Sequence, residues 1–150
     1  MRVRDAMTAN VICCTPQTTL AAAAVLMAEG RCRTLPVVRN GKTVGMVTDR
    51  DICVALAAAE CLPSELPVAD VMSEVLYTCH EDDDIGQAVE TMKRHRVRRL
   101  PALDRDGALA GVLSIYDVLA KAGDTNGVSY REAVIAFQMI GGRPSAARQL

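Results

Sequence analysis

Apolar and polar residues follow the same order in two stretches of this chain. Residues 35–51 read LPVVRNGKTVGMVTDRD, and residues 100–117 read LPALDRDGALAGVLSIYD. In each stretch, two short apolar runs flank a polar pair, Asn40-Gly41 or Asp106-Gly107, and such pairs favour the tight turn of a β-hairpin. The repetition predicts a duplicated structural unit with one hairpin in each copy.

A helix with a 3.6-residue apolar period is predicted before each hairpin. The first begins after Thr18 or Thr19, either of which can cap it, and ends at Gly30. The second spans residues 84–96, with acidic residues at its start and basic residues in its last turn, as the helix dipole favours. The apolar faces contain Leu20, Ala23, Ala24 and Met27 in the first helix, and Ile85, Ala88, Val89 and Met92 in the second.

A further helix follows each hairpin, at residues 48–60 and 114–123, and an extended stretch precedes the first helix of each copy. Each copy is therefore a β-α-β-β-α repeat, and the predicted fold class is α+β. Because such a repeat leaves one apolar sheet face uncovered, we expect the two copies to pack against one another. The expected boundaries are residues 1–62 and 63–121, with a link that contains Pro63 and Pro67.

Residues 122–150 form a C-terminal extension in which one more helix is predicted. Ser129 and Glu132 match a capping box, and an apolar stripe follows at helical spacing. The stripe consists of Tyr130, Ala133, Val134, Phe137 and Ile140. Two interpretations stay open: the stripe packs on its own domain, or it contacts a second copy or another partner.

The composition limits the classes of partner. Half of the 150 residues are hydrophobic but only 3% are aromatic, so any ligand pocket is expected to be mainly aliphatic. The net charge of −1 provides no overall field that would attract nucleic acid or an anionic membrane. No apolar run approaches the ~18 residues of a membrane span, and the first residues lack the apolar core of a signal peptide. We expect a cytoplasmic protein.

The sequence contains only weak signals of metal binding, redox activity or catalysis. The six cysteines include no C-x-x-C pair and the chain has two histidines, so we expect reduced thiols and no metal site, with a redox role for Cys13-Cys14 as an alternative. The basic run at residues 93–99 straddles a helix end and a strand start, so its side chains cannot all point the same way, and few aromatic residues could stack on bases. We therefore expect no nucleic-acid binding. No nucleophile, base and orienting group form a recognisable set, so the chain is not expected to be an enzyme.

Candidate chemistry lies where each hairpin meets its following helix. A hydroxyl residue stands three positions before an aspartate in both copies, as Thr48 and Asp51, and as Ser114 and Asp117. These pairs fit simple helix capping. They also fit a nucleotide site, because helix N–H groups attract phosphate and a carboxylate can accept hydrogen bonds from ribose hydroxyls. Arg33 and Arg98 stand at the same position in the two copies, two residues before the Leu-Pro of the strand, and Arg50 lies beside Asp51. A guanidinium suits phosphate oxygens.

The duplicated pieces resemble the CBS domain, a family named after cystathionine β-synthase that occurs as tandem pairs. The matching pieces are DAMT, LPVV, the Asn-Gly turn and GMVTDRD in the first copy, and DVMS, RRLPAL, DG and GVLSIYD in the second. The resemblance covers about residues 3–120. It implies a CBS pair with pseudo-twofold symmetry and two clefts, in which such modules commonly hold AMP, ADP, ATP or S-adenosylmethionine.

The resemblance also implies ligand-binding residues by motif position. In one cleft Asp117 would bind ribose, Ser114 and Tyr116 would lie near the phosphates, and the base would contact Val112, Ile12 and Cys32. The other cleft would mirror it with Asp51, Thr48, Arg50, Met46, Tyr77 and Val97. Arg33 and Arg98 would face phosphate. Because the two copies differ in sequence, we expect the clefts to bind with unequal affinities.

The leading hypothesis is a non-catalytic regulatory module that binds an adenosine-containing nucleotide and signals its occupancy to a protein partner, as many energy or metabolite sensors of this family do. It requires no cofactor beyond this regulatory ligand, and we expect a homodimer. The alternative is a structural or dimerisation protein without a ligand.

Overall fold

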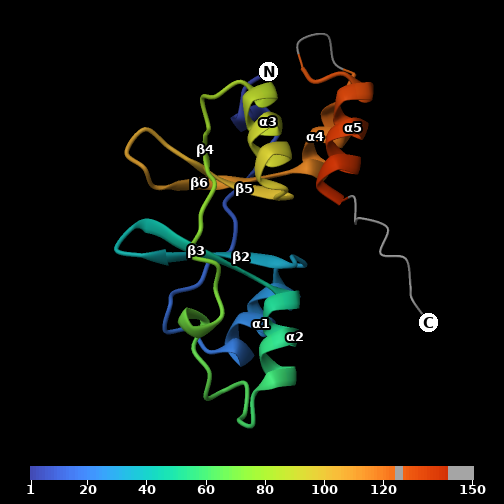
Figure 1. Ribbon diagram of the computed structural model, residues 1–150. Helices are drawn as coiled ribbons and strands as arrows, with labels where there is room; N and C mark the ends of the chain where they lie inside the picture. Colours follow the sequence, from blue (N-terminus) through green and yellow to red (C-terminus); the bar gives the residue numbers. More distant parts are fainter. Residues whose placement is uncertain (124–126, 142–150) are drawn as a thin grey trace, which may run out of the picture. The chain divides into compact units, whose positions relative to one another are not determined.

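The computed structural model describes residues 1–123 and 127–141, and the chain forms two compact units (Figure 1). We name each unit after its candidate aspartate. The Asp51 unit contains Asn10–Leu76 and Arg105–Leu109. The Asp117 unit contains Met1–Ala9, Tyr77–Asp104 and the described residues from Ala110 onward.

The Asp51 unit is built on one hairpin and two α-helices. Strands β2 (Thr34–Arg39) and β3 (Lys42–Thr48) pair antiparallel, with Leu35 opposite Val47. Helices α1 (Leu20–Glu29) and α2 (Asp49–Ala58) lie on the same side of the hairpin in Figure 1, and a short 3₁₀ helix, η2, spans Val68–Asp70. The predicted turn is confirmed, since Asn40 and Gly41 both have positive φ, at 52° and 76°.

The core of the Asp51 unit is aliphatic, as the composition predicts. It consists of Cys14, Leu20, Ala23, Met27, Leu35, Val37, Val47, Ile52 and Val68. Of the four residues predicted on the apolar face of α1, Leu20, Ala23 and Met27 are buried and Ala24 is exposed. The buried stripe of α1 is therefore narrower than the sequence pattern indicates.

The Asp117 unit holds a four-stranded sheet with the order β1-β6-β5-β4. Its strands are β1 (Thr8–Ala9), β4 (Cys79–His80), β5 (Arg99–Leu103) and β6 (Leu109–Ser114). β1 pairs antiparallel with β6, and β4 pairs parallel with β5. A 3₁₀ helix, η1 (Val3–Asp5), precedes β1, and the α-helices are α3 (Ile85–His95), α4 (Ile115–Lys121) and α5 (Tyr130–Gly141).

The extension contributes α5 to the core of the Asp117 unit, where it packs on α3 and α4. The predicted capping box is confirmed: Glu132 Oε2 accepts hydrogen bonds from Ser129 Oγ at 2.6 Å and from Ser129 N at 3.0 Å. These hydrogen bonds lower the pKa of Glu132. Of the predicted apolar stripe, Ala133 and Ile140 are buried, whereas Tyr130, Val134 and Phe137 are exposed.

The segments that open the two sequence repeats belong to the opposite units. Val3 N donates to Asp83 O at 3.0 Å and Ile85 N donates to Met1 O at 3.0 Å, so residues 1–9 join the Asp117 unit. In the same way, Val68 N donates to Thr18 O at 2.8 Å in the Asp51 unit. The start of each sequence repeat therefore lies in the compact unit of the other repeat. We call these starts the exchanged opening segments. The expected domain boundaries followed the sequence repeats and not these compact units.

Membrane insertion of a helix was not expected from the hydropathy. Within residues 1–123 and 127–141, no helix has both the length and the apolar character needed to cross a bilayer.

Candidate functional site

The first candidate junction joins β3 to α2 in the Asp51 unit. Thr48 is the N-cap of α2, and its Oγ1 accepts a hydrogen bond from Asp51 N at 3.2 Å. The Oδ2 atom of Asp51 accepts in return from Thr48 N at 2.9 Å and from Thr48 Oγ1 at 2.7 Å. The capping interpretation of this pair is therefore confirmed.

The second junction joins β6 to α4 in the Asp117 unit and has the same geometry. Ser114 Oγ accepts from Asp117 N at 3.2 Å. The Oδ2 atom of Asp117 accepts from Ser114 N at 2.8 Å and from Ser114 Oγ at 2.6 Å. Two junctions that are far apart in sequence thus agree to within about 0.1 Å in each hydrogen bond.

Capping does not use the whole of either carboxylate. Each aspartate makes three capping hydrogen bonds, two through its Oδ2 atom and one through its main-chain N. The Oδ1 atoms of Asp51 and Asp117 have no hydrogen-bond partner in the part of the chain that is described. Both side chains are half-buried. The capping box fixes the orientation of the carboxylate, and Oδ1 stays available to accept a hydrogen bond from a ligand hydroxyl.

The arginines Arg33 and Arg98 occupy equivalent backbone positions. The carbonyl oxygen of Arg33 accepts from Asp49 N at 3.2 Å, and that of Arg98 accepts from Ile115 N at 3.0 Å. Each arginine is therefore anchored to the first residue of the helix that carries the candidate aspartate. The backbone thus brings both arginines beside the junctions, and their role in binding phosphate stays a prediction.

The charges around the two arginines differ. Arg33 Nε donates to Asp49 Oδ2 at 2.7 Å, and the side chains are 78% and 44% accessible to solvent, respectively. The residue equivalent to Asp49 is Ile115, which is fully buried, so Arg98 has no carboxylate at this position. The sequence interpretation missed Asp49, although its place between Thr48 and Asp51 was a signal that a second acid lies at the junction.

Arg50 and Tyr116 are equivalent residues in the first turns of α2 and α4, and both are exposed. The main-chain N of Arg50 donates to Asp49 Oδ1 at 2.9 Å. The ring of Tyr116 meets the ring of Phe137 edge to face, with centroids 5.8 Å apart and an interplanar angle of 66°. Tyr116 thereby connects the Asp117 junction to α5.

Two of the predicted adenine contacts lie together in the Asp51 unit. A Cβ atom at Gly30 would lie 2.7 Å from Ile12 Cδ1 and 3.3 Å from Cys32 Sγ, so both side chains approach the end of α1. Their proximity depends on the absence of a side chain at Gly30. Ile12 is partly exposed and Cys32 is half-buried.

The predicted base contacts on the strands are also equivalent. Met46 in β3 exchanges main-chain hydrogen bonds with Ser73, at 2.9 and 3.2 Å, and Val112 in β6 pairs with Thr8. Met46 is half-buried and Val112 is buried. Ser73 and Thr8 both come from the exchanged opening segments, so these segments flank the same strand position in each unit.

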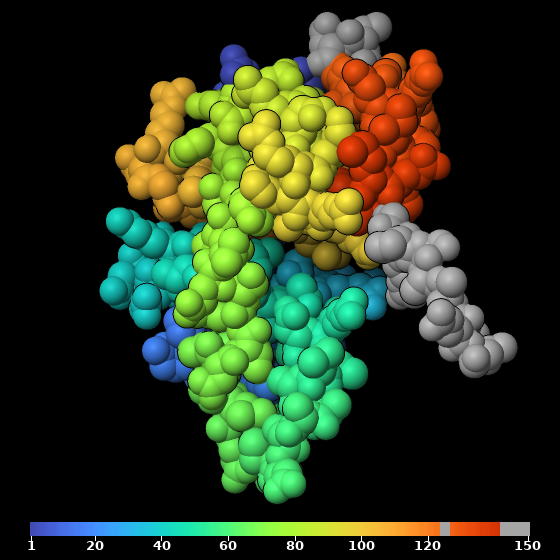
Figure 2. All heavy atoms as spheres, in the orientation of Figure 1, coloured from blue at the N-terminus to red at the C-terminus, as the bar shows by residue number. Residues whose placement is uncertain are grey.

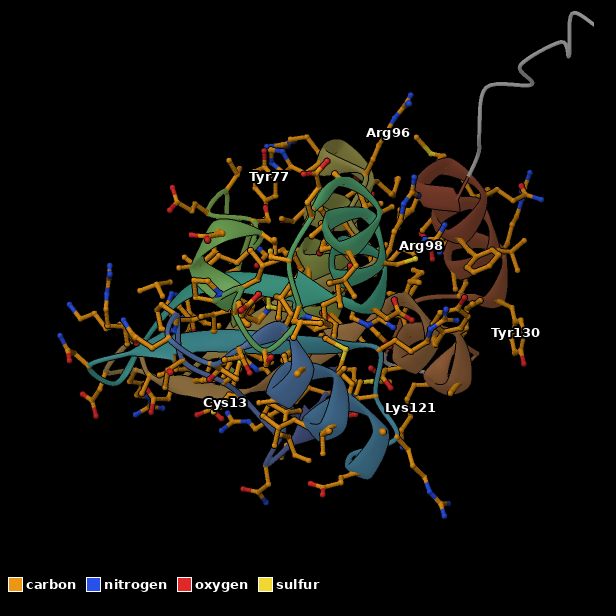
Figure 3. All side chains as sticks on the ribbon, turned by 90° about the horizontal axis from the view of Figure 1, so that it is seen from below. Cys13, Tyr77, Arg96, Arg98, Lys121 and Tyr130 are labelled. Atoms are coloured by element: carbon orange, nitrogen blue, oxygen red, sulfur yellow. The ribbon has the colours of Figure 1, made fainter. Side chains whose placement is uncertain are left out.

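Tyr77 and Val97 belong to the Asp117 unit and pack against its core. The ring of Tyr77, labelled in Figure 3, stacks on His95 with centroids 3.7 Å apart and an interplanar angle of 13°. The sequence interpretation did not identify His95. The predicted site residues therefore divide into seven in each unit, and the expected grouping of Asp117 with Ile12 and Cys32, and of Asp51 with Tyr77 and Val97, remains a prediction.

A separate groove of about 290 Å³ lies between α3 and α5, which are side by side in Figure 2. It is lined by side chains of both signs together with apolar residues. The lining residues include Asp84, Val89, Glu90, Lys93, Glu132 and Ile135. None of the predicted site residues lines this groove, so it is not part of either junction.

All six cysteines are free thiols. Burial is the main cause that raises the pKa of Cys14 to about 11, with a smaller contribution from Cys13, and burial with the nearby Asp83 charge raises the pKa of Cys79 to about 12. A thiol with a raised pKa forms little thiolate at neutral pH, which weakens the redox interpretation of Cys13-Cys14. Among the described residues, no group of three or more potential ligands could hold a metal ion.

Two β-hairpins, each followed by a helix whose N-cap pairs with a half-buried aspartate, define a tandem CBS-type repeat protein. The CBS domain family model matches residues 3–58 and 68–124. The chain therefore belongs to the CBS domain family.

Curated relatives agree with this assignment. The chain is 34% identical over 116 residues to the CBS domain-containing protein YhcV of Bacillus subtilis, which covers 77% of this chain and 81% of the relative. It is 33% identical over 119 residues to inosine-5'-monophosphate dehydrogenase of Thermoplasma acidophilum, covering 79% of this chain but only 22% of the enzyme. The chain thus spans most of the first relative and about a fifth of the second.

Solved structures share the fold. Hypoxic Response Protein I, crystallised with two coordinated zinc ions, is 30% identical, with a TM-score of 0.72 over 80% of this chain and 98% of that one. CBSX2 in complex with AMP is 25% identical, with a TM-score of 0.68 over 80% of this chain and 94% of that one.

Proposed function

We propose that this protein is a non-catalytic regulatory module that binds an adenosine-containing nucleotide (AMP, ADP, ATP or S-adenosylmethionine) at its two aspartate junctions. The observation that carries the proposal is the arrangement of Asp51 and Asp117. Each carboxylate is fixed by a capping box through Oδ2, while Oδ1 has no partner among the described residues.

The chemistry of this arrangement suits a ribose. The two cis hydroxyls of a ribose are hydrogen-bond donors, and a carboxylate oxygen has two lone pairs with which to accept them. A charge-assisted hydrogen bond of this kind is stronger than a neutral one. Because the capping box holds the side chain in place before a ligand arrives, little conformational entropy is lost when the ribose binds.

Phosphate groups would be bound by the arginines beside the junctions. Arg98 is exposed and has an isoleucine where Arg33 has Asp49, so its guanidinium is not neutralised from that position. Arg33 forms an ion pair with Asp49, and an incoming phosphate has to compete with this carboxylate. The Asp117 junction is therefore the tighter site for a phosphorylated ligand, and affinities at the two junctions are unequal.

The relatives support the ligand class. CBSX2, which shares the fold at 25% identity, was crystallised in complex with AMP. The match to inosine-5'-monophosphate dehydrogenase covers 22% of that enzyme, which fits a regulatory module better than an enzyme. The six free thiols suit a reducing compartment, and we place the protein in the cytoplasm, where occupancy would be signalled to a partner protein.

A structural or dimerisation role without a ligand is the second candidate. The capping boxes favour it, because helix capping alone accounts for the duplicated Thr48-Asp51 and Ser114-Asp117 pairs. The two candidates differ in what they predict for Oδ1 of each aspartate: only the nucleotide-binding module uses it.

Titration calorimetry with AMP, ADP, ATP and S-adenosylmethionine tests the proposal. We expect heat of binding for at least one ligand, and about ten- to a hundredfold weaker binding for Asp117→Asn, because a charged hydrogen bond of roughly 1.5–3 kcal/mol is lost. Asparagine keeps an oxygen for the capping box, so this variant separates binding from folding. Absence of heat with all four ligands at millimolar concentration would leave the structural role as the function.

A further inference from the structure

The stacked rings of Tyr77 and His95 connect two segments of the Asp117 unit. Tyr77 precedes β4 in a stretch without regular secondary structure, and His95 is the last residue of α3. The rings are nearly parallel, with an interplanar angle of 13° and centroids 3.7 Å apart. Because Tyr77 is half-buried and His95 is exposed, the ring pair lies at the surface, where a ligand can reach it.

The Asp51 unit has the equivalent pair of positions, occupied by different residues. Ile12 and Gly30 have the same spacing in the sequence as Tyr77 and His95. Gly30 follows α1 as His95 ends α3, and in both units the next residue is an arginine with positive φ, at 48° and 53°. Ile12 lies over Gly30, since a Cβ atom there would be 2.7 Å from Ile12 Cδ1.

The two units therefore present different chemistry at this position. In the Asp51 unit an aliphatic side chain covers a glycine, whereas in the Asp117 unit one ring rests on another. An aliphatic side chain attracts a base only by dispersion and burial. An aromatic ring can also stack on the π face of the base, which strengthens nucleotide binding in a way that tolerates differences in base sequence.

The stack on α3 fixes the orientation of the Tyr77 ring. Residues 74–78 lie in neither helix nor strand, so the local backbone does not hold this side chain in place. Helix α3, in contrast, is anchored in the core by buried residues that include Val89 and Met92. Because His95 is part of this helix, its ring orders Tyr77 before a ligand arrives, and the entropy cost of ordering a side chain on binding is avoided.

We propose that His95 is a positioning residue for base recognition: it holds Tyr77 as a flat platform, and the aromatic base of a nucleotide stacks on the face of Tyr77 turned away from His95. This inference rests on the proposed function, because it concerns the base of the same ligand. It adds a residue that makes no contact with the ligand itself. It also predicts that base recognition differs between the positions of Tyr77 and Ile12.

The charges near the ring pair favour an anionic aromatic ligand over a neutral one. Arg94 and Arg96 flank His95 in the sequence, and Arg98 follows two residues later. All three arginines are exposed, and Figure 3 labels Arg96 and Arg98 together with Tyr77. A nucleotide combines a flat base with negatively charged phosphate, so its chemistry complements both the rings and the cations.

Titration calorimetry of the full chain with AMP, ADP, ATP and S-adenosylmethionine, and with ribose 5-phosphate as a ligand that lacks the base, tests the proposal. We expect His95→Ala to bind the adenosine ligands about tenfold more weakly and ribose 5-phosphate as the wild type does. His95→Phe keeps a ring and should restore the affinity, whereas His95→Leu should not. His80→Ala is the matched control: it removes the other imidazole of the chain, from β4, and should leave all affinities unchanged.

A double-mutant cycle tests whether His95 acts through Tyr77. Tyr77→Ala removes the platform and should weaken binding of the adenosine ligands by roughly ten- to a hundredfold. Adding His95→Ala to this variant should then cause no further loss, because a residue that only orients Tyr77 has nothing left to orient. Circular dichroism confirms that each variant is folded.

The outcomes separate this inference from the proposed function. A wild type that binds none of the adenosine ligands overturns both. If the wild type binds and His95→Ala binds equally well, or if His95→Phe fails to restore the affinity, the positioning role is wrong and the proposed function stands. Additive losses in the double variant, or an equal loss for ribose 5-phosphate, also overturn the positioning role, because His95 would then act on the ligand without Tyr77 or the base.

Discussion

Ser114 Oγ lies 2.6 Å from Asp117 Oδ2, and the equivalent atoms of Thr48 and Asp51 lie 2.7 Å apart. In both units the residue that caps the helix also orients the carboxylate proposed to bind ribose. Capping and ligand binding are therefore not competing explanations of one aspartate. If the proposed function holds, we expect the hydroxyl residue to stabilise the helix directly and to affect ligand binding mainly through the aspartate that it orients.

Removal of the capping hydroxyl should consequently affect stability more than binding. Ser114→Ala deletes the acceptor for Asp117 N and one donor to Asp117 Oδ2, and such caps contribute about 1 kcal/mol. We expect a loss of about that size in the free energy of unfolding, measured by urea denaturation. Nucleotide affinity should fall by less than in Asp117→Asn, because the charge on the carboxylate is retained.

Thr48→Ala in the other unit is the matched comparison, since Thr48 makes the same three hydrogen bonds with Asp51. If Ser114→Ala abolished nucleotide binding at unchanged stability, the hydroxyl itself would be a ligand contact and the positioning role would be wrong.

Neutralising Asp49 should strengthen binding at the weaker junction. Asp49→Asn removes the carboxylate that accepts a hydrogen bond from Arg33 and that would compete with a ligand phosphate for its guanidinium. Because the Arg33 side chain is 78% and the Asp49 side chain 44% accessible, solvent screens the ion pair, and the unfolding midpoint should hardly change. Calorimetry with ATP should show a several-fold higher affinity at the Asp51 junction.

The double variant Arg33→Ala, Asp49→Asn controls for effects that do not involve the arginine. It should lose the gained affinity, since the cation that binds phosphate is gone. Equal affinities of the single and double variants would show that Asp49 acts without Arg33.

Local sequence signals were sufficient to predict the hairpins and most helices. The turn residues that pattern analysis identified have the positive φ that it required, at 52° for Asn40, 76° for Gly41 and 80° for Gly107. Capping residues mark the starts of α1, α2, α4 and α5 at Thr19, Thr48, Ser114 and Ser129. These features depend on contacts within a few residues, and a sequence shows them directly.

Features that depend on distant contacts were not visible in the pattern. Strands β1 and β4 have two residues each, too few to show a period, and the exchanged segments are held by backbone hydrogen bonds such as Val3 N to Asp83 O. The Arg33–Asp49 pair spans the hairpin, and it was missed because 16 residues separate its members. The division of the α5 stripe into buried Ala133 and Ile140 and exposed Tyr130, Val134 and Phe137 likewise became apparent only when the packing of α5 on α3 and α4 was known.

Alanine at Gly111 should loosen the exchanged N-terminal segment. A Cβ atom there would lie 2.5 Å from Thr8 O, a main-chain atom, and 3.0 Å from Met7 Sδ, so β1 has to move away from β6. We expect a loss of about 2 kcal/mol or more in the free energy of unfolding, with faster amide hydrogen exchange at residues 3–9.

Gly45→Ala is the matched control in the Asp51 unit. There the nearest atom to the added Cβ is Met72 Sδ at 2.7 Å, the end of a flexible side chain, and the main-chain oxygen of Ser73 is farther away at 3.1 Å. This variant should be destabilised less than Gly111→Ala. The reverse order would contradict the close approach of β1 to β6.

The buried thiols of Cys14 and Cys79 should make the folded state less stable at high pH. Their ordinary pKa is 9.0, and folding raises it to about 11 for Cys14 and about 12 for Cys79, mainly by burial. Below pH 9 both folded and unfolded chains keep these protons, so the thiols leave stability unchanged there. Between pH 9 and about 11 or 12 the unfolded chain releases protons that the folded chain retains, and stability falls by at most about 1.4 kcal/mol per pH unit for each thiol.

Urea denaturation between pH 7.5 and 11 measures this loss, and Cys79→Ala isolates one thiol. The variant is less stable at every pH because a buried side chain is shortened. Its stability should nevertheless fall less steeply above pH 9 than that of the wild type, because lysines and tyrosines titrate alike in both proteins and only one thiol differs. If the free energy of unfolding fell equally steeply with pH in both proteins, Cys79 would lose its proton as easily in the folded chain as in the unfolded one. Burial would then not raise the pKa of this thiol.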